Sequence, residues 1–267
     1  EFRRVLFRSM TDVPNEANPE EWAEPAGTFL RYLNLESEII TAGADSPINL
    51  NESQNFWLVL SGSLTVFSVD NQTGTRQTLY RVDAGGLVQG TNIAENDSFR
   101  DFHIVGISTN QTKVVPVQGQ QLLNAIDTIS DSPAPAELID NMVVSMLSAL
   151  RVTLNDPIGA RRIDPGTEQE ISEDEEIYSD GGVVWIQAPP ESLSLGYSDD
   201  FSPEASYPDG PELAWVPVIS TNWWRIKKAF QSQVITTAQR LAMGSIETDI
   251  AQFHSLLIRI FNEVTRW

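Results

Sequence analysis

The chain has 267 residues, of which 41% are hydrophobic, and its 37 acidic and 17 basic side chains give a formal charge of −20. It contains no cysteine and two histidines, which excludes disulfides and thiolate–zinc sites and disfavours a multi-histidine metal centre. No apolar run reaches the ~18–20 residues of a membrane span, and a strongly negative field repels phosphates and anionic headgroups. We therefore expect a cytoplasmic protein that inserts into no membrane and binds no nucleic acid, metal or cofactor.

The N-terminal part differs in composition from the rest. Residues 1–9 (EFRRVLFRS) carry three arginines, and Met10 follows them. They resemble translated sequencing-adapter sequence, and we interpret them as a non-native leader; the alternative is a genuine basic arm. Residues 10–28 are acidic, contain proline and show little periodicity, which predicts a flexible lead-in. Residues 29–40 are expected to form a short helix or strand.

The most regular stretch runs from Asn55 to Gly90. Two apolar runs, 56–60 and 64–69, are separated by Ser61-Gly62, and residues 64–69 alternate polar and apolar as a half-buried strand does. Strands with turns between them indicate a small antiparallel roll or sandwich. The other runs with strand character in this half are 48–50, 78–82, 102–108 and 113–117.

After this roll the apolar period becomes helical. Residues 120–129 and 136–152 carry apolar side chains at helical spacing, so 29–154 is predicted as one domain and 155–170 as a linker. Strands return in the smaller domain 171–267, which ends in a helix over 245–266 whose pattern predicts continuation beyond Trp267. The fold class is mainly β with added helices, as tandem cyclic-nucleotide-binding or cupin-like rolls, each followed by helices. The strands expected in the second domain are 181–187, 192–196, 213–220 and 223–226.

The clearest candidate site lies between Gly85 and Gly106. Glycine-rich backbone can cradle a phosphate, and an arginine can pair with it. A roll, a glycine-flanked cassette with a downstream arginine, and then helices resemble the cyclic-nucleotide-binding domains. That family holds the ribose with the Glu of Phe-Gly-Glu and the cyclic phosphate with the Arg of Arg-Ser/Thr-Ala. Val88-Gln89-Gly90 and Arg100-Asp101-Phe102 stand at those places, so we expect a degenerate cassette made of Gly85, Gly86, Gln89, Gly90 and Arg100.

No catalytic residue is expected. A cupin enzyme needs a cluster of histidines on its roll, where this chain has only His103, and neither a Gly-x-Ser-x-Gly elbow nor a Walker loop is present. His254 is expected to pack in a helix. Trp223 and Trp224 should point to opposite faces of a strand, one into the core and one toward an interface.

A second resemblance covers about residues 30–267. The chain is similar to the N-terminal region of the ABC exporters of NHLP (nitrile hydratase-like leader peptide) bacteriocin systems, in the form without a peptidase domain. The resemblance implies an accessory, regulatory cytosolic segment at the inner membrane that docks on the transporter core of the same or a partner chain, with leader or modified peptide or a second copy as further partners. The similar segments are FWLVLSG (56–62), VFSV (66–69), LYRVDAGG (79–86), GGVVWI (181–186) and QFHSLL (252–257).

Two other functions stay open from the sequence. One is a stand-alone cyclic-nucleotide-binding sensor or adaptor, and the other is a metal-dependent cupin enzyme.

Overall fold

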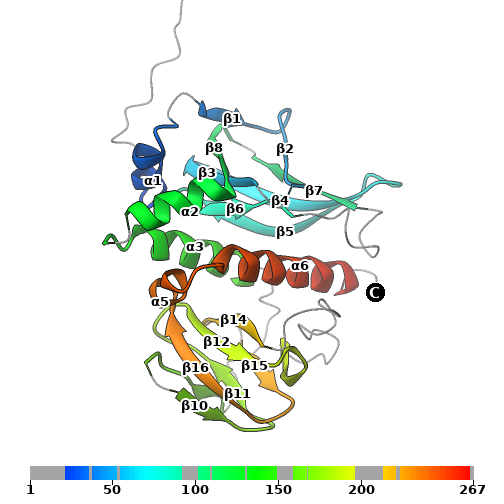
Figure 1. Ribbon diagram of the computed structural model, residues 1–267. Helices are drawn as coiled ribbons and strands as arrows, with labels where there is room; N and C mark the ends of the chain where they lie inside the picture. The colour runs from blue at the N-terminus through cyan, green and yellow to red at the C-terminus, as the bar shows by residue number, and fades with distance from the viewer. Residues whose placement is uncertain are drawn as a thin grey trace, which may run out of the picture.

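The chain forms two β-rich units with helices between them (Figure 1). The structure is a computed structural model that describes residues 22–35, 38–52, 55–91, 102–108, 110–129, 131–148, 159–166, 168–195, 213–220 and 223–264. The helices are α1 (Ala26–Leu33), α2 (Gly119–Thr128), α3 (Ala134–Ser148), α5 (Thr237–Ala242) and α6 (Ile246–Val264), with a short 3₁₀ turn at Pro190–Ser192.

The first unit is the predicted antiparallel roll. Its two four-stranded sheets have the orders β1-β8-β3-β6 and β2-β7-β4-β5, which is the order of a jelly roll. Leu58, Leu64 and Ile104 are fully buried, because each lies on the inward side of a strand. The strands are β1 (Ile40–Ala42), β2 (Ile48–Asn49), β3 (Asn55–Ser61), β4 (Ser63–Asp70), β5 (Arg76–Asp83), β6 (Leu87–Gln89), β7 (Phe102–Ile107) and β8 (Thr112–Gln118).

The second unit follows the same strand order where it is described. Its sheets are β10-β16-β12-β14 and β13-β15-β11-β9, so β10, β16, β12 and β14 take the places of β1, β8, β3 and β6. β9 is an addition that pairs with β11 in parallel. The strands are β9 (Arg161–Arg162), β10 (Glu168–Ile171), β11 (Glu176–Tyr178), β12 (Val184–Ala188), β13 (Leu193–Leu195), β14 (Ala214–Val218), β15 (Trp224–Ile226) and β16 (Phe230–Thr236).

The prediction of a mainly β chain with helices is confirmed, and several boundaries differ from those expected. Helix α1 begins at Ala26, inside the range predicted as lead-in, and its Phe29 and Leu30 are fully buried. Strand β9 and all of β10 except Ile171 lie inside the range predicted as linker. β16 and α5 were not predicted. In β16 three polar residues follow one another, Gln231, Ser232 and Gln233, and Ser232 takes a buried position that an apolar residue would mark. Residues 1–21 and 197–211 lie outside the described part.

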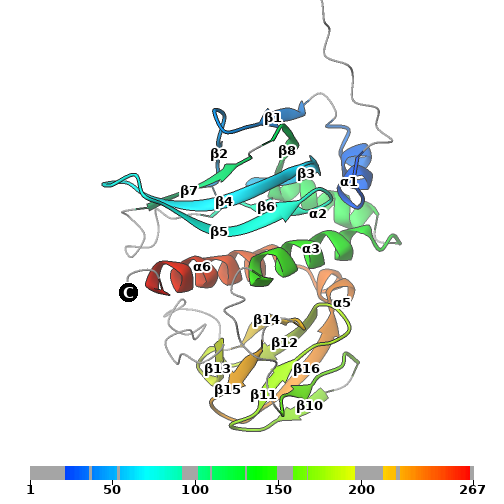
Figure 2. The same ribbon diagram turned by 180° about the vertical axis from the view of Figure 1, so that it is seen from behind.

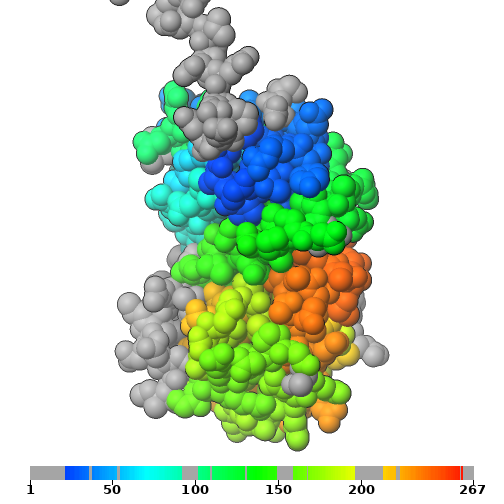
Figure 3. Space-filling view, turned by 90° about the vertical axis from the view of Figure 1, so that its left-hand side faces the viewer, coloured from blue at the N-terminus to red at the C-terminus, as the bar shows by residue number. Residues whose placement is uncertain are grey.

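Helices α3 and α6 lie side by side between the two β units, as both ribbon views show (Figures 1 and 2). In the space-filling view, the segment around α3, in green, separates the first roll from the second unit (Figure 3). Phe253 of α6 contacts Trp224 of β15 with the ring centroids 6.4 Å apart. Buried residues of both units form one continuous hydrophobic core. Of the helices in the described residues, none is long and apolar enough to cross a bilayer.

Candidate functional site

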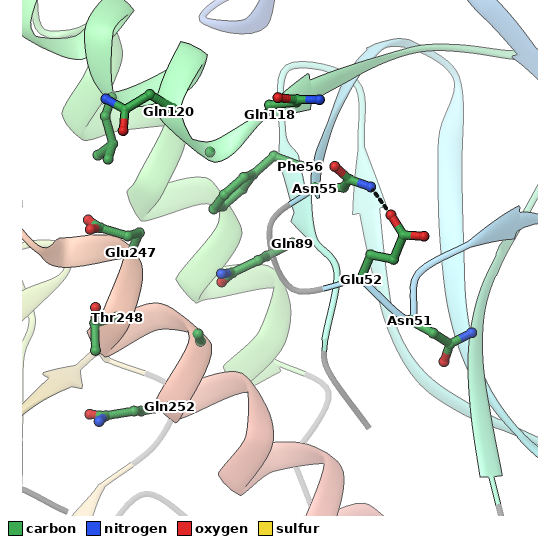
Figure 4. Close-up of a pocket in the computed structure, with 13 residues that line it drawn as sticks. Asn51, Glu52, Asn55, Phe56, Gln89, Gln118, Gln120, Glu247, Thr248 and Gln252 are labelled. Atoms are coloured by element: carbon green, nitrogen blue, oxygen red, sulfur yellow. Dashed lines mark hydrogen bonds between the residues drawn. The ribbon is translucent and has the colours of Figure 1, made fainter. Parts of the chain in front are cut away.

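An open groove of about 840 Å³ lies where the first roll faces the N-terminal half of α6. Figure 4 shows the roll on one side of it and α6 on the other. Its walls come from three places that are distant in sequence: the loop into β3 together with β6, the junction of β8 and α2, and α6. The lining residues are Asn51, Glu52, Asn55, Phe56, Gln89, Gln118, Gly119, Gln120, Leu123, Glu247, Thr248, Ala251 and Gln252.

The roll wall is held by a tight backbone crossing at Gly90. The Gly90 N–H donates to the Asn55 carbonyl oxygen at 2.8 Å. A Cβ placed on Gly90 would lie 2.0 Å from the Glu52 carbonyl oxygen, so only glycine fits there. The Asn55 side chain donates from Nδ2 to Glu52 Oε2 at 2.6 Å, the contact drawn in Figure 4. The crossing therefore fixes the Glu52 carboxylate at the rim of the groove.

The second wall forms where β8 continues directly into α2. The Gln118 N–H, at the N-cap, donates to Gln121 Oε1 at 3.1 Å and so satisfies one of the amides at the helix start. Gln120 Nε2 donates to Asn124 Oδ1 at 3.1 Å, one turn along the helix. The Gln118 side chain in turn accepts from the backbone N–H of Gln121, so the two residues form a capping box at the rim of the groove.

The third wall is one face of α6. Glu247, Thr248, Ala251 and Gln252 are spaced as neighbours on one side of a helix, and all of them line the groove. Glu247 lies in the first turn, where the helix dipole favours an acidic side chain. Its Oε2 atom is buried and has no hydrogen-bond partner among the described residues. That oxygen lacks the donor that a buried carboxylate requires.

Helix α6 is attached to the first roll by a buried polar contact. Tyr80 on β5 and His254 on α6 lie with the hydroxyl oxygen 2.9 Å from the imidazole Nε2, and both side chains are buried. Burial lowers the pKa of His254 to about 4, so the ring is neutral at pH 7. Burial also raises the pKa of Tyr80. A neutral pair can exchange one hydrogen bond without placing a charge in the core.

On its other side α6 is fixed by a buried ion pair. Arg240 of α5 lies 2.5 Å from Asp249 of α6, and the side chains are 6% and 10% exposed. The Arg240 guanidinium also lies over the Trp215 ring of β14, 5.4 Å from its centroid. Burial raises the pKa of Asp249 to about 6, against the opposing attraction of Arg240. Helix α6 is therefore held by both β units.

The groove is polar and acidic. Glu52 and Glu247 bring two carboxylates, six asparagine and glutamine side chains surround them, and none of the lining residues that the structure describes is basic. The one aromatic residue, Phe56, is 2% exposed and offers little ring surface for stacking. A ligand that suits these walls forms many neutral hydrogen bonds and carries no uncompensated negative charge.

Three glycines of the expected phosphate cassette have their backbone amides engaged within the roll. Gly85 and Gly86 lie in the β5–β6 turn, where their N–H groups donate to the carbonyl oxygens of Val59 (2.8 Å) and Asp83 (3.1 Å). The N–H of Gly90, at the other end of β6, donates to the Asn55 carbonyl oxygen. These three amides are not available to a phosphate, because each is already satisfied by backbone. Arg100 lies outside the described residues.

Of the predicted site residues that the structure describes, only Gln89 lines the groove, where Figure 4 shows its amide reaching from the roll toward α6. Glu52, Glu247 and Gln252 were missed. Glu52 is a lone acidic residue in a loop, and Glu247 and Gln252 lie on the polar side of an amphipathic helix. Neither pattern indicates locally that the residues share a site. Only the glycine beside Gln89 pointed to this region.

The two tryptophans differ from expectation. Trp223 is 3% exposed and Trp224 is fully buried, so neither indole is open at a surface. The Trp224 Nε1 donates to the Pro217 carbonyl oxygen at 2.9 Å. The Trp224 ring packs against Phe253 of α6 as part of the hydrophobic core. The interface prediction at these residues is corrected accordingly.

His103 is hydrogen-bonded from Nδ1 to Asn71 Oδ1 at 2.6 Å on the surface of the roll. Within the described ranges, no three histidine, aspartate or glutamate side chains are grouped so as to hold a metal ion.

Comparison with known proteins leaves the family open. No protein-family model matches the chain, and no curated protein sequence matches it. Solved structures match over about half of the chain. They include the CO-sensing protein from R. rubrum (17% identity, TM-score 0.34, 47% of this chain and 53% of that one). The c-di-GMP responsive global regulator CLP of Xanthomonas campestris has 17% identity, a TM-score of 0.33 and coverages of 47% and 59%. The Thermus thermophilus catabolite activator protein has 20% identity, a TM-score of 0.30 and coverages of 51% and 56%.

The chain thus spans about half the length of the structures that it matches. At TM-scores near 0.3 these likenesses decide neither the family nor the function.

Proposed function

We propose that the chain is a non-catalytic, ligand-responsive regulatory module built from two rolls, in which a polar ligand in the groove controls the seating of α6. The observation that carries this is the origin of the third wall: α6 follows the second β unit in sequence, yet it lines a groove of the first roll. A ligand that touches both the roll and α6 changes the free energy of their contact, because it binds the seated arrangement better than any other.

The remaining contacts of α6 make it a suitable coupling element. Its Asp249 and Phe253 contact residues of the second half, Arg240 and Trp224, while His254 contacts Tyr80 of the first. A displacement of α6 at the groove would change its contacts with Arg240 and Trp224 and so alter the packing of the second unit. Ligand binding at one roll is therefore expected to alter the surface of the other.

A thermal-shift screen against a library of small polar compounds tests this function. Thr248→Trp fills the groove from an exposed position of α6, and Val144→Trp adds the same ring at an exposed position of α3 outside the groove. Compounds that stabilise the native chain and the Val144 variant, but not the Thr248 variant, support the proposal. A screen whose stabilising compounds act equally on all three proteins contradicts it.

Two finer functions from the sequence stay proposals. The stand-alone cyclic-nucleotide sensor keeps the roll as its support, while the occupied amides of Gly85, Gly86 and Gly90 count against the phosphate cassette. Calorimetry with cyclic AMP and cyclic GMP on the native chain and on Arg100→Ala tests it.

The exporter segment, with its transporter, peptide or dimer partners and its place at the inner membrane, has the sequence resemblance alone as its support. The expected absence of nucleic-acid binding rests on the charge of −20, and the expected absence of catalysis rests on the missing motifs.

A further inference from the structure

We infer that α5 is a pH-sensitive joint between the two β units, in which the Asp140 carboxyl of α3 takes up the proton and mild acid tightens the contact. The inference goes beyond the proposed function, because it depends on neither the groove nor its ligand. Helix α5 follows β16 directly, and a capping box between Thr236 and Gln239 closes its first turn. It packs against β12 and β16 of the second unit and also against α3, which in turn packs against β5 and β6 of the first roll.

One turn of α5 carries two polar contacts to the helices between the units. Thr237 and Arg240 are one turn apart, and both are buried. The Thr237 hydroxyl donates to Asp140 Oδ1 of α3, and Arg240 forms the ion pair with Asp249 of α6. A change at this turn therefore acts on the attachment of the second unit to α3 and α6 together.

The contact with Asp140 is the end of a buried hydrogen-bond chain. The Trp185 indole of β12 is fully buried and donates from Nε1 to Thr237 Oγ1 at 2.9 Å. A hydroxyl has a single hydrogen, so Thr237, which accepts from the indole, donates that hydrogen to the Asp140 carboxylate. The chain runs from the core of the second unit to a carboxylate on α3, and separation of α3 from α5 breaks it.

The carboxylate makes this contact sensitive to pH. Burial raises the pKa of Asp140 to about 6, above its usual 3.8; the Thr237 hydrogen bond opposes this shift, and the negative charge of Glu137 adds to it. When α3 and α5 separate, the carboxyl regains water and its pKa falls toward the usual value. The docked arrangement therefore binds the proton more tightly, and docking strengthens as the pH falls through about 6.

The other charged groups at this junction act separately from Asp140. Arg240 lies 2.5 Å from Asp249, whose own pKa is raised by burial, so protonation of Asp249 acts in the same direction. Protonation of His254, whose pKa burial lowers, acts in the opposite direction. A variant at Asp140 alone isolates its contribution from theirs. Among the described residues, the charged groups near this turn are Glu137 of α3, Arg240 of α5, and Glu247 and Asp249 in the first turn of α6.

Hydrogen exchange of the α5 amides, corrected for the intrinsic effect of pH, measures how often the joint opens. Between pH 7.5 and pH 5 we expect opening to become about tenfold rarer in the native chain relative to Asp140→Asn, which keeps the acceptor oxygen and cannot titrate. The matched control is Asp127→Asn, which changes an exposed aspartate of α2 and should follow the native chain. An equal pH dependence in the native chain and in Asp140→Asn overturns the inference.

A second measurement follows the hydrogen-bond chain itself. In protein labelled with ¹⁵N-tryptophan, the Trp185 indole resonance is assigned by its loss in Trp185→Phe. It should shift with a midpoint near pH 6 in the native chain and lose that step in Asp140→Asn. Thr237→Val removes the hydroxyl that stabilises the carboxylate, so the midpoint of α5 opening should move to higher pH. An indole resonance that does not titrate in the native chain also overturns the inference.

Discussion

The Tyr80 hydroxyl and the His254 Nε2 lie 2.9 Å apart although 174 positions separate the two residues in the chain. This contact joins β5 of the first roll to the helix that ends the second half. Its rings meet edge to face with centroids 5.5 Å apart. It makes the position of α6, and with it the third wall of the groove, a property of both halves.

Replacing Tyr80 by Phe tests the strength of this attachment. The variant leaves the buried His254 ring without its partner, so we expect a loss of about 1–3 kcal/mol in the free energy of unfolding. Tyr32→Phe is the matched control, because Tyr32 is 57% exposed, and it should change stability by less than about 0.5 kcal/mol. Urea denaturation measures both. Equal effects of the two substitutions would contradict the role given to the pair.

The same histidine predicts a pH dependence. The pKa of His254 is lowered to about 4 in the folded chain, below its usual 6.5, so the unfolded chain takes up the proton first as the pH falls. The stabilising contribution is therefore complete above about pH 6.5 and is lost between there and about pH 4. The loss approaches about 3 kcal/mol relative to His254→Leu.

Asp140 and Asp249 contribute with the opposite sign, because burial raises the pKa of each to about 6. Their contributions are common to the native chain and the His254→Leu variant, so they largely cancel in the difference. Denaturation of both proteins at pH 7.5, 6, 5 and 4.5 measures that difference. A value that does not change with pH would show that His254 is not a buried neutral ring.

Gly90→Ala tests the backbone crossing that shapes the roll wall. The new Cβ would lie 2.0 Å from the Glu52 carbonyl oxygen, and that backbone cannot move away without breaking the Gly90–Asn55 hydrogen bond. We expect a loss of about 3 kcal/mol or more in stability. Gly181→Ala is the control, since a Cβ there meets no atom within 4 Å. Thermal unfolding that treats the two variants alike would refute the crossing.

Arg240→Met tests the attachment of α6 to the second unit. It leaves the Asp249 carboxylate buried without its ion-pair partner, which costs about 3–5 kcal/mol. Adding Asp249→Asn removes the stranded charge and should recover part of that loss. Arg81→Met breaks an exposed pair with Asp83, whose side chains are 63% and 72% exposed, and should cost at most about 1 kcal/mol. Chemical denaturation in which the exposed pair proves as costly as the buried one would contradict this assignment.

Local pattern was sufficient for several of the elements and insufficient for the site. Alternation over residues 64–69 predicts β4, and helical spacing predicts α6, because each pattern reports which side of one element is buried. The pattern does not indicate which other element packs against that buried side. Nothing near His254 in sequence indicates Tyr80, and nothing near Glu247 indicates Glu52.

The glycines of the expected cassette show the same limit of local pattern. Glycines in sequence order look like one phosphate loop, yet three residues of β6 separate the turn at Gly85 from the crossing at Gly90. Each glycine answers a local steric demand, as the 2.5 Å approach of a Cβ on Gly85 to the Glu24 carbonyl oxygen shows. Glycine serves both in tight backbone turns and in phosphate-binding loops, and the sequence alone does not distinguish the two uses.

The most direct test of the coupling through α6 is hydrogen exchange of its backbone amides, measured with and without a saturating groove ligand from the thermal-shift screen. The account predicts added protection both in the loop that carries Glu52 and in the first turns of α6, and no such change in the Thr248→Trp variant. Protection confined to the roll, with α6 exchanging as in the free protein, would contradict it.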